Sequence, residues 1–494
     1  MKKVLILNPP GPTNHYINRD LMGGMGQKTN FGRDIRSKII SGLKSNFIHI
    51  PVVQLVYAAT ILAENNFEIK VIDAPNEELN LNQVLEKSRE FNPDFIIMEV
   101  SSSCLIFERD VVAKKLKEIF PLAKIITTGD TITHDTEQFK QPFDISIFGE
   151  VERVILDICK NEKKLSKITG IIYRNKNRDI IRNAEKKMLS NEELNNLPFP
   201  RWDLFPITKY VYYPLLTKRP VALVQSTRGC PYGCGYCSYP VNQGLKWRAR
   251  SAENIVNELE NDIKKYGIKA VFFRDPLFTL DKNRIKQICR LIKEKNLDLI
   301  FCFETRPELL TIELLDKLYN AGCRAINFGV EDIHPEILEK ILRKPISTEK
   351  IREIINYAEK IGIRTTCFFI IGLPGSTRQT IKETIDFSKL LNPSYADFKI
   401  ATPYPGTYLH KLATENKWIV KEGYDQISGY NASMQISEEL TPEFVEKTCK
   451  DAFNSYYLRF SYLKREIMRG TIIEKTRMIF SSLFSSIFIR RYNG

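Results

Sequence analysis

The sequence predicts an α/β protein built on two parallel sheets: a doubly wound sheet first, then a partial (β/α)6 barrel and a helical C-terminal region. Three observations predict this. Short apolar runs alternate with helical segments through residues 1–160. After a break, the alternation resumes at residue 221 with six strand signals, too few for a closed eight-fold barrel. Beyond residue 430 the strand signals stop.

The N-terminal segment, residues 1–160, alternates strand and helix signals. Ile50–Glu64 has helical periodicity and Phe107–Phe120 is amphipathic. Since helices separate the strands, the sheet should be parallel and should bind its ligand outside the carboxyl ends of the strands. The five predicted strands are Lys3–Asn8, Glu68–Asp73, Asp94–Val100, Lys124–Thr128 and Asp144–Phe148.

Residues 161–215 break this rhythm and are predicted to form a packed connector. Ile168–Tyr173 and Asp179–Arg182 flank Lys176-Asn177 in the manner of a hairpin. Leu197-Pro198-Phe199-Pro200 and an aromatic stretch follow.

Residues 216–430 are predicted to form the partial barrel, and residues 431–494 a helical extension. Between the strands, Ser251–Lys265 has a plausible N-cap in Ser251 and a favourable acidic residue, Glu253, in its first turn. The six predicted strands are Val221–Ser226, Ala270–Phe273, Leu299–Phe303, Ala325–Gly329, Thr365–Gly372 and Phe398–Ala401.

Composition limits the cellular setting and the partners. The 494 residues contain 43% hydrophobic residues and no run of 18 apolar residues, so no spanning helix is expected. No signal peptide is expected either, and a cytoplasmic protein is predicted. The net charge is +14, but the basic residues are spread along the chain, so no nucleic acid partner is expected. Anionic small ligands or an anionic lipid surface suit this charge better.

Three of the ten cysteines, Cys230, Cys234 and Cys237, cluster in one short loop after a predicted strand. Gaps of three and two residues let one loop present three thiolates on one face. The other cysteines are isolated, so a fourth zinc ligand is not evident, and a cubane iron–sulfur cluster with one open iron fits better. A zinc site, or three unrelated buried cysteines, is the alternative. Three glycines permit the tight turns that such a loop needs: Gly229, Gly233 and Gly235.

The segment Thr227-Arg228-Gly229-Cys230-Pro231-Tyr232-Gly233-Cys234-Gly235-Tyr236-Cys237 closely resembles the signature of the radical S-adenosylmethionine (SAM) superfamily. The resemblance implies that Cys230, Cys234 and Cys237 ligate a [4Fe-4S] cluster whose open iron is chelated by SAM. It also implies a SAM-binding role for residues at the ends of later strands. After the second strand the sequence departs from the family's Gly-Gly-Glu-like turn, and Asp275 is expected to take the place of that turn. The implied SAM-contact residues are Tyr236, Asp275, Glu304, Arg306, Glu331 and Gly372.

A doubly wound segment joined through Leu-Pro-Phe-Pro to this barrel resembles the cobalamin-binding subclass of the superfamily, whose N-terminal domain is Rossmann-like. Leu7-Asn8-Pro9-Pro10, Val71–Pro75 and Gly149-Glu150-Val151-Glu152 carry the resemblance. The Asp-x-His-x-x-Gly motif of other cobalamin proteins is absent, as it usually is in this subclass. The resemblance implies bound cobalamin; the alternative is a domain kept for packing or substrate capture. The implied cobalamin-contact residues are Asn8, Ser101, Ser102, Gly129, Gly149 and Glu150.

In finer detail, Gly23-Gly24-Met25-Gly26 and Arg33-Asp34-Ile35-Arg36-Ser37 resemble hopanoid-biosynthesis proteins of the J type, with a more distant likeness to anaerobic magnesium-protoporphyrin cyclases. The implied activity is reductive cleavage of SAM to a 5′-deoxyadenosyl radical and hydrogen abstraction from an unactivated carbon, ending in methyl transfer. Cyclisation or rearrangement of a lipid-like substrate is the alternative, and a non-catalytic metal-binding scaffold a further one. A flavodoxin or ferredoxin would supply electrons, and the substrate would be a small or lipid-like molecule.

The C-terminal tail pairs an apolar face with a serine face at helical spacing. It is too short to span a bilayer but long enough to lie on one, so peripheral contact with the inner face of the membrane is one hypothesis. Packing against the enzyme or a neighbouring subunit is the alternative. The apolar face comprises Ile479, Phe480, Leu483, Phe484, Ile487 and Phe488.

Overall fold

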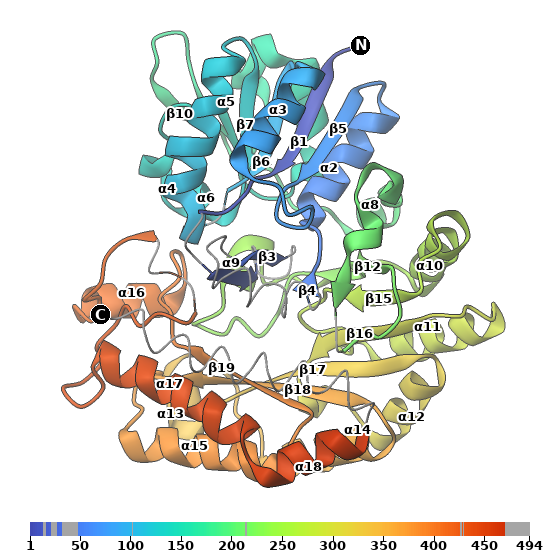
Figure 1. Ribbon diagram of the computed structural model, residues 1–494, viewed down its shortest axis with the longest axis vertical. Coiled ribbons are helices and arrows are strands. Elements are labelled where there is room, and N and C mark those ends of the chain that lie inside the picture. Colours follow the sequence, from blue (N-terminus) through green and yellow to red (C-terminus); the bar gives the residue numbers. More distant parts are fainter. Residues whose placement is uncertain are drawn as a thin grey trace.

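The computed structural model describes residues 1–12, 16–20, 27–31, 48–100, 102–212, 215–424, 427 and 429–469. Two large sheets organise this part of the chain, one with seven strands and one with six. In Figure 1 the first sheet and its helices lie at the top, and the second sheet lies below. The α/β fold class predicted from the sequence is confirmed.

The first sheet has a parallel core. Its strands are β1 (Lys3–Asn8), β5 (Glu68–Asp73), β6 (Phe95–Glu99), β7 (Lys124–Thr128), β8 (Ile145–Ile147), β9 (Ile171–Arg174) and β10 (Ile180–Arg182). Their order is β10-β9-β8-β7-β6-β1-β5, and the five from β8 to β5 run parallel. These five match the strands predicted from the apolar runs.

The predicted hairpin is not a separate connector. Strand β9 pairs antiparallel with β8, through Ile147↔Ile171 and Ile145↔Tyr173, and β10 pairs with β9. Ile171 and Ile172 are fully buried, so pairing with β8 hides apolar surface that a free-standing hairpin would expose. The first sheet therefore extends beyond the boundary predicted at residue 160.

Helices cover both faces of the first sheet. Val4 and Ile6 of β1 share one apolar core with helices α2 and α7, whereas Leu5 and Leu7 share the other with α3 and α5. Strands buried on both faces are continuously apolar, as parallel strands usually are. The helix expected over 107–120 is broken by a π-helical segment at 108–113. The helices are α2 (Val53–Glu64), α3 (Leu81–Phe91), α4 (Leu105–Phe107), α5 (Lys114–Ile119), α6 (Asp130–His134) and α7 (Ile155–Lys160).

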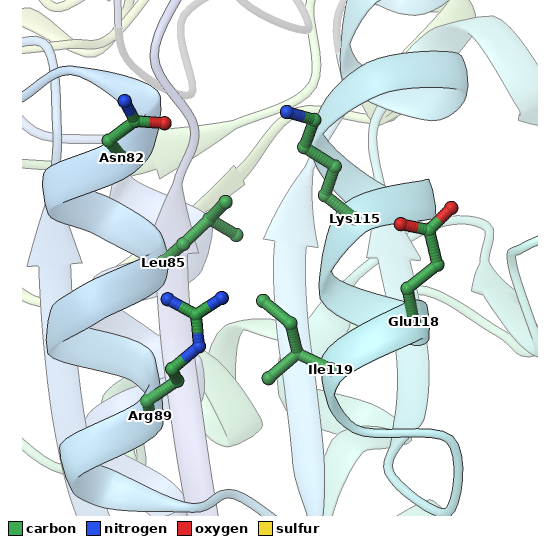
Figure 2. A pocket seen from close by; sticks show the side chains of 6 residues that line it. All are labelled: Asn82, Leu85, Arg89, Lys115, Glu118 and Ile119. Atoms are coloured by element: carbon green, nitrogen blue, oxygen red, sulfur yellow. The ribbon is translucent and has the colours of Figure 1, made fainter.

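A shallow pocket of about 320 Å³ lies between α3 and α5. Figure 2 shows three side chains from each helix lining it. None of them belongs to the predicted site. They are Asn82, Leu85, Arg89, Lys115, Glu118 and Ile119.

The second sheet is an open parallel barrel. Its strands follow chain order, β12-β15-β16-β17-β18-β19, and every neighbouring pair is parallel. Strands β12 and β19 do not pair with each other, so the partial barrel predicted from six strand signals is confirmed. The strands are β12 (Val221–Val224), β15 (Ala270–Phe273), β16 (Ile300–Thr305), β17 (Cys323–Glu331), β18 (Arg364–Ile371) and β19 (Tyr395–Ile400).

Helices follow the barrel strands along the chain. Ser251 caps α10 by accepting a hydrogen bond from the backbone N–H of Asn254, as its position in the sequence predicts. The helices are α10 (Ala252–Tyr266), α11 (Lys282–Glu294), α12 (Ile312–Asn320), α13 (Pro335–Lys340), α14 (Thr348–Lys360), α15 (Arg378–Leu391) and α16 (Tyr408–Glu415).

The two sheets share one apolar core. Trp202, Phe205 and Tyr210, from the stretch between them, belong to the same buried cluster as Val4 of the first sheet and Val224 of the barrel. Tyr210 also donates a hydrogen bond to Asp73 at the end of β5, with an O···O distance of 2.8 Å. The stretch after the hairpin is therefore packed, as predicted.

The C-terminal region is helical. Helix α17 (Pro442–Tyr457) packs against β19, and α18 (Phe460–Arg469) follows it. No helix within the described residues is long and apolar enough to cross a membrane. The predicted amphipathic tail at 479–488 lies outside these residues, as do the motifs at 23–26 and 33–37.

Candidate active site

The three clustered cysteines lie in a loop that leaves the carboxyl end of β12. A short antiparallel ribbon, β13 (Thr227–Arg228) with β14 (Arg248–Ala249), closes the base of this loop. Helix α9 (Ser238–Gln243) starts directly after Cys237. Figure 1 shows α9 between the two large sheets. We call residues 229–247 the cluster loop.

The three cysteine thiols are free, and backbone N–H groups point at the sulfurs of Cys230 and Cys237. Burial raises the pKa of Cys230, and hydrogen bonds from the N–H groups of Tyr232 and Gly233 to its sulfur lower it. Burial likewise raises the pKa of Cys237, opposed by the N–H of Tyr239. Such donors stabilise thiolates, the form that binds iron. The donor set therefore fits an iron–sulfur cluster.

No three His, Cys, Asp or Glu side chains among the described residues converge closely enough to share one metal ion. In a cubane cluster each cysteine thiolate binds a different iron, so the cysteine sulfurs are held farther apart than they are around a single metal ion.

Two distant segments of the barrel hold the middle of the cluster loop. The N–H of Gly235 donates to the carbonyl of Ile341 at 2.7 Å, and its carbonyl accepts from the N–H of Leu409 at 2.8 Å. A Cβ at Gly235 would lie 2.8 Å from a ring carbon of Tyr408 and 2.9 Å from the Ile341 carbonyl. Only glycine fits this close approach.

Asp275, after β15, orders the start of the cluster loop. Its Oδ1 accepts hydrogen bonds from the backbone N–H groups of Ser226 (2.7 Å) and Thr227 (2.9 Å), and its Oδ2 accepts one from the Ser226 hydroxyl. The side chain is fully buried. Contact between Asp275 and SAM stays a prediction, and the observed bonds give this carboxylate a different role, that of holding the loop.

Tyr236, Glu331 and Arg343 gather beside Cys234. One guanidinium nitrogen of Arg343 lies 3.8 Å from the Cys234 sulfur and 3.3 Å from the Tyr236 hydroxyl, and another donates to the Gly329 carbonyl at 2.7 Å. The same guanidinium lies 3.9 Å from the Glu331 carboxylate. Burial raises the pKa of Glu331, while Arg343 lowers it.

Glu331 adopts a left-handed backbone conformation, with φ of +70°, beside a register shift in the pairing of β17 with β18. Such a conformation is costly for a non-glycine residue and is concentrated at functional sites. The sequence predicted a site role for Tyr236 and Glu331 but missed Arg343. A single basic residue far along the chain from Cys234 carries no local signal of this contact.

We expect Arg343→Met to make the cluster harder to reduce, because a buried positive charge beside a cluster ligand stabilises the added electron. The midpoint potential, followed by electron paramagnetic resonance (EPR) during redox titration, should fall by roughly 60 mV, equivalent to tenfold for one electron. Arg324→Met is the control, since Arg324 bonds carbonyls near the start of β17. An unchanged potential in Arg343→Met would contradict the prediction.

The remaining predicted SAM-contact residues lie at strand ends but are less closely associated with the cluster cysteines than Tyr236 and Glu331 are. Glu304 pairs with Arg274 at 2.8 Å. Arg306 stacks 4.2 Å above the ring of Tyr232 in the cluster loop and bonds the Lys344 carbonyl at 2.7 Å. Gly372 would direct a Cβ toward Val445 of α17. Their SAM roles stay predictions.

The predicted cobalamin contacts lie at the carboxyl edge of the first sheet. Asn8, at the end of β1, donates to Asp73 at 2.8 Å, while its buried Oδ1 has no hydrogen-bond partner among the described residues. Gly129 has a φ of +145°, and a Cβ there would lie 2.1 Å from the Val100 carbonyl. Gly149 has a φ of +87°, and no atom of the described residues lies within 4 Å of a Cβ built there. Ser101 and the side chain of Ser102 lie outside the described residues.

Glu150 is engaged differently from the other first-sheet residues. Its carboxylate pairs with Arg228 at 3.0 Å and Arg248 at 2.7 Å, both at the base of the cluster loop. Glu152 pairs with Arg228 as well, at 2.5 Å. Contact between Glu150 and a corrin stays a prediction; the structure shows that its side chain joins the two sheets, a pairing that sequence alone could not reveal.

Sequence comparison places these features among known proteins. Residues 224–388 match the radical SAM superfamily. An uncharacterized methyltransferase of Pyrococcus horikoshii is 30% identical over 433 residues, covering 86% of this chain and 92% of that protein. The anaerobic magnesium-protoporphyrin IX monomethyl ester cyclase of Rubrivivax gelatinosus is 26% identical, covering 72% and 65%.

Among solved structures, the cobalamin-dependent SAM radical enzyme OxsB, with aqua-cobalamin and SAM bound, superimposes with a TM-score of 0.67 at 18% identity. The match covers 90% of this chain and 70% of OxsB, so the likeness in fold extends over both sheets. The matched superfamily region begins on β12 and includes the whole cluster loop. Together with the 30% identity across most of the Pyrococcus protein, this match establishes that the chain belongs to the radical SAM superfamily.

Proposed function

We propose that the protein is a cobalamin-dependent radical SAM methyltransferase that acts on an unactivated carbon. One observation carries the proposal: loops at the carboxyl edge of the first sheet touch the cluster loop directly. His134, at the end of α6, lies 3.1 Å from Asn242 of α9, and Glu150 lies 3.0 Å from Arg228. Since parallel sheets bind ligands at this edge, a cofactor held there lies next to the cluster.

The residues at that edge are compatible with cobalamin. Within the described part of the chain, the Oδ1 of Asn8 has no partner and offers a buried acceptor, and Gly149 leaves room for close approach of a ligand to the backbone. The cofactor would carry a methyl group from one SAM molecule to the substrate. This chain would hold the cluster through Cys230, Cys234 and Cys237, and orient SAM with the Tyr236, Glu331 and Arg343 group.

Two relatives bear on the reaction. The Pyrococcus relative, matched over nearly its full length, is described as a methyltransferase, which favours methyl transfer. The cyclase of Rubrivivax favours a second candidate, radical cyclisation without methyl transfer. Both candidates take a small or lipid-like substrate and a flavodoxin or ferredoxin as electron donor. Peripheral membrane contact through the C-terminal tail is part of the proposal for a lipid-like substrate.

Metabolite and lipid extracts are compared between cells with and without the gene. Cells without the gene should accumulate a compound that lacks one methyl group of its counterpart in cells with the gene. The compound that lacks the methyl group is then incubated anaerobically with reduced protein, SAM and cobalamin. A methyltransferase yields both S-adenosylhomocysteine and 5′-deoxyadenosine with the product. A cyclase yields 5′-deoxyadenosine and a product that has lost hydrogen, without S-adenosylhomocysteine. Absence of a corrin absorption band after purification with cobalamin available would contradict the methyl-transfer proposal.

A further inference from the structure

Two arginines face each other at the base of the cluster loop. Arg228 of β13 and Arg248 of β14 are direct partners in the antiparallel ribbon. Their side chains are only 3% and 4% exposed. Like charges placed opposite each other in an antiparallel pair are destabilising, and burial removes the water that would screen them. The ribbon therefore requires counter-charges to close.

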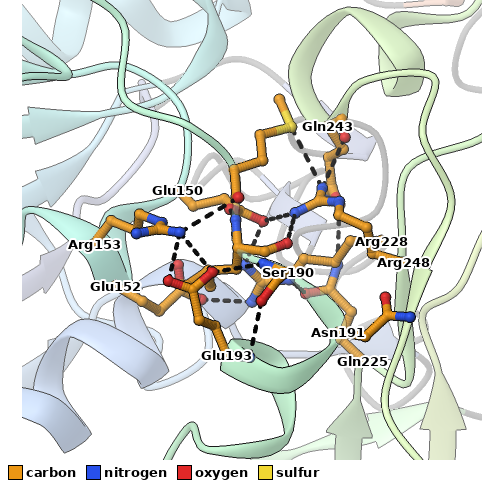
Figure 3. A network of polar contacts seen from close by, with 12 residues as sticks. Glu150, Glu152, Arg153, Ser190, Asn191, Glu193, Gln225, Arg228, Gln243 and Arg248 are labelled. Carbon is orange, nitrogen blue, oxygen red and sulfur yellow. Dashed lines mark hydrogen bonds and ion pairs between the residues drawn. The ribbon is translucent and has the colours of Figure 1, made fainter.

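The first sheet supplies those counter-charges. One oxygen of Glu150 accepts hydrogen bonds from both arginines, at 3.0 Å from Arg228 and 2.7 Å from Arg248. The other oxygen accepts from the backbone N–H of Leu189 at 2.5 Å. Glu152 completes the set through its 2.5 Å contact with Arg228. Figure 3 shows these side chains converging, with the dashed lines crossing between segments far apart in the sequence.

The surroundings favour the charged forms of Glu150 and Arg228. Burial raises the pKa of Glu150, but the positive charges of Arg228 and Arg248 lower it, and the net result is a pKa below the ordinary value. The pKa of Arg228 is raised by Glu152 and Glu150 against the opposing effect of burial. This buried site therefore holds two carboxylates and two guanidinium groups, and loss of any one of them leaves their numbers unequal.

We propose that Glu150 and Glu152 act as an acidic clamp that closes the base of the cluster loop, so that retention of the cluster depends on the first sheet. The clamp acts through Arg228 and Arg248, which makes its members positioning residues. Arg228 is two residues before Cys230, so a shift at the ribbon is transmitted directly to the first cluster ligand. The inference rests on the part of the proposed function that places a cluster in this loop, and it is independent of cobalamin or methyl transfer.

The clamp has a distinctive energetic signature. Removing one partner of a buried ion pair leaves an uncompensated charge and is strongly destabilising, whereas neutralising both partners is often nearly neutral. Glu150→Gln leaves two facing arginines with one carboxylate. Adding Arg248→Gln removes the surplus charge and leaves Arg228 paired with Glu152. The double variant should therefore outperform the single one.

The test uses the full chain, reconstituted anaerobically with iron and sulfide. Iron content, the EPR spectrum of the reduced cluster and the rate of 5′-deoxyadenosine formation from SAM are measured for both variants. Glu150→Gln should lower the rate of SAM cleavage about tenfold, with a matching loss of cluster signal. A tenfold loss corresponds to less free energy than the full cost of an unpaired buried charge, because Glu152 still pairs with Arg228. Glu150→Gln/Arg248→Gln should recover most of both.

Glu193→Gln is the matched control. Glu193 belongs to the same polar network, where it pairs with Arg153 at 2.6 Å, but among the described residues its hydrogen bonds and ion pairs reach neither the cluster loop nor the two arginines at its base. A glutamine there can keep the capping box with Ser190, so this variant should behave as the unaltered protein. The proposal is overturned if Glu150→Gln keeps full iron content and SAM cleavage, or if the double variant is no better than the single one. None of the three readouts involves a methyl acceptor, so failure of the methyl-transfer proposal leaves this test intact.

Discussion

Cys234→Ala is expected to abolish SAM cleavage. Cys234 is the central cysteine of the cluster loop, and its sulfur lies 3.8 Å from Arg343. With only two thiolates left in the loop, the cluster loses one of its three protein ligands. Anaerobic reconstitution should give little cubane EPR signal, and 5′-deoxyadenosine formation after reduction should fall to background.

The matched control is Cys289→Ala. Cys289 lies on α11, is only 3% exposed, and burial raises the pKa of its thiol to about 12, which marks it as an inert core cysteine. This variant should keep its iron and its SAM cleavage. Retention of full activity by Cys234→Ala would contradict the assignment of the cluster loop, and with it the chemistry proposed for this protein.

Gly229→Ala should be nearly as damaging, although it removes no chemical group. Gly229 precedes the first cluster cysteine, has a φ of +80°, and a Cβ there would lie 2.1 Å from the Lys246 carbonyl across the loop. The substitution combines backbone strain with a clash against backbone, at a combined cost of roughly 3–5 kcal/mol. Because the clash is within the loop, cluster content should fall more steeply than global stability.

Gly267→Ala separates the two contributions. Gly267 follows α10 with a φ of +66°, but no atom of the residues that the structure describes lies within 4 Å of a Cβ built there. The Gly267→Ala substitution should therefore lower the free energy of unfolding by only about 1 kcal/mol, from backbone strain alone, and leave the iron content unchanged. Thermal unfolding and iron assays on both variants check this. Equal iron content in the two alanine variants would show that the clash at residue 229 is relieved by movement elsewhere.

Most of the architecture was predictable because parallel strands buried on both faces are continuously apolar, and β1, β7 and β15 match their predicted bounds. The hairpin of β9 and β10 was placed in the connector because a pattern of alternating residues does not reveal which strand it will pair with. The helix over 107–120 was predicted as continuous because helical periodicity does not show a local π-helical segment.

The candidate site also has a part that the sequence predicts and a part that only the fold reveals. Cys230, Cys234 and Cys237 are close in sequence, so one loop reveals them. Arg343 approaches Cys234 only through the fold. Glu150 was assigned to a cofactor from its position after β8, and its pairing with Arg228 joins residues 78 positions apart. Contacts of this kind depend on tertiary geometry, which a single sequence without an alignment does not encode in any local pattern.

The apolar core shared by the two sheets has a consequence for motion. A hinge between them would have to pull the stretch that carries Trp202 and Tyr210 away from one side: Trp202 donates a hydrogen bond to Asp262 of α10 at 3.1 Å, and Tyr210 donates one to Asp73 of β5 at 2.8 Å. Opening such a seam would expose buried aromatic surface to water, which opposes wide domain swinging. The separation between the strand ends of one sheet and the loop of the other is therefore set when the chain folds.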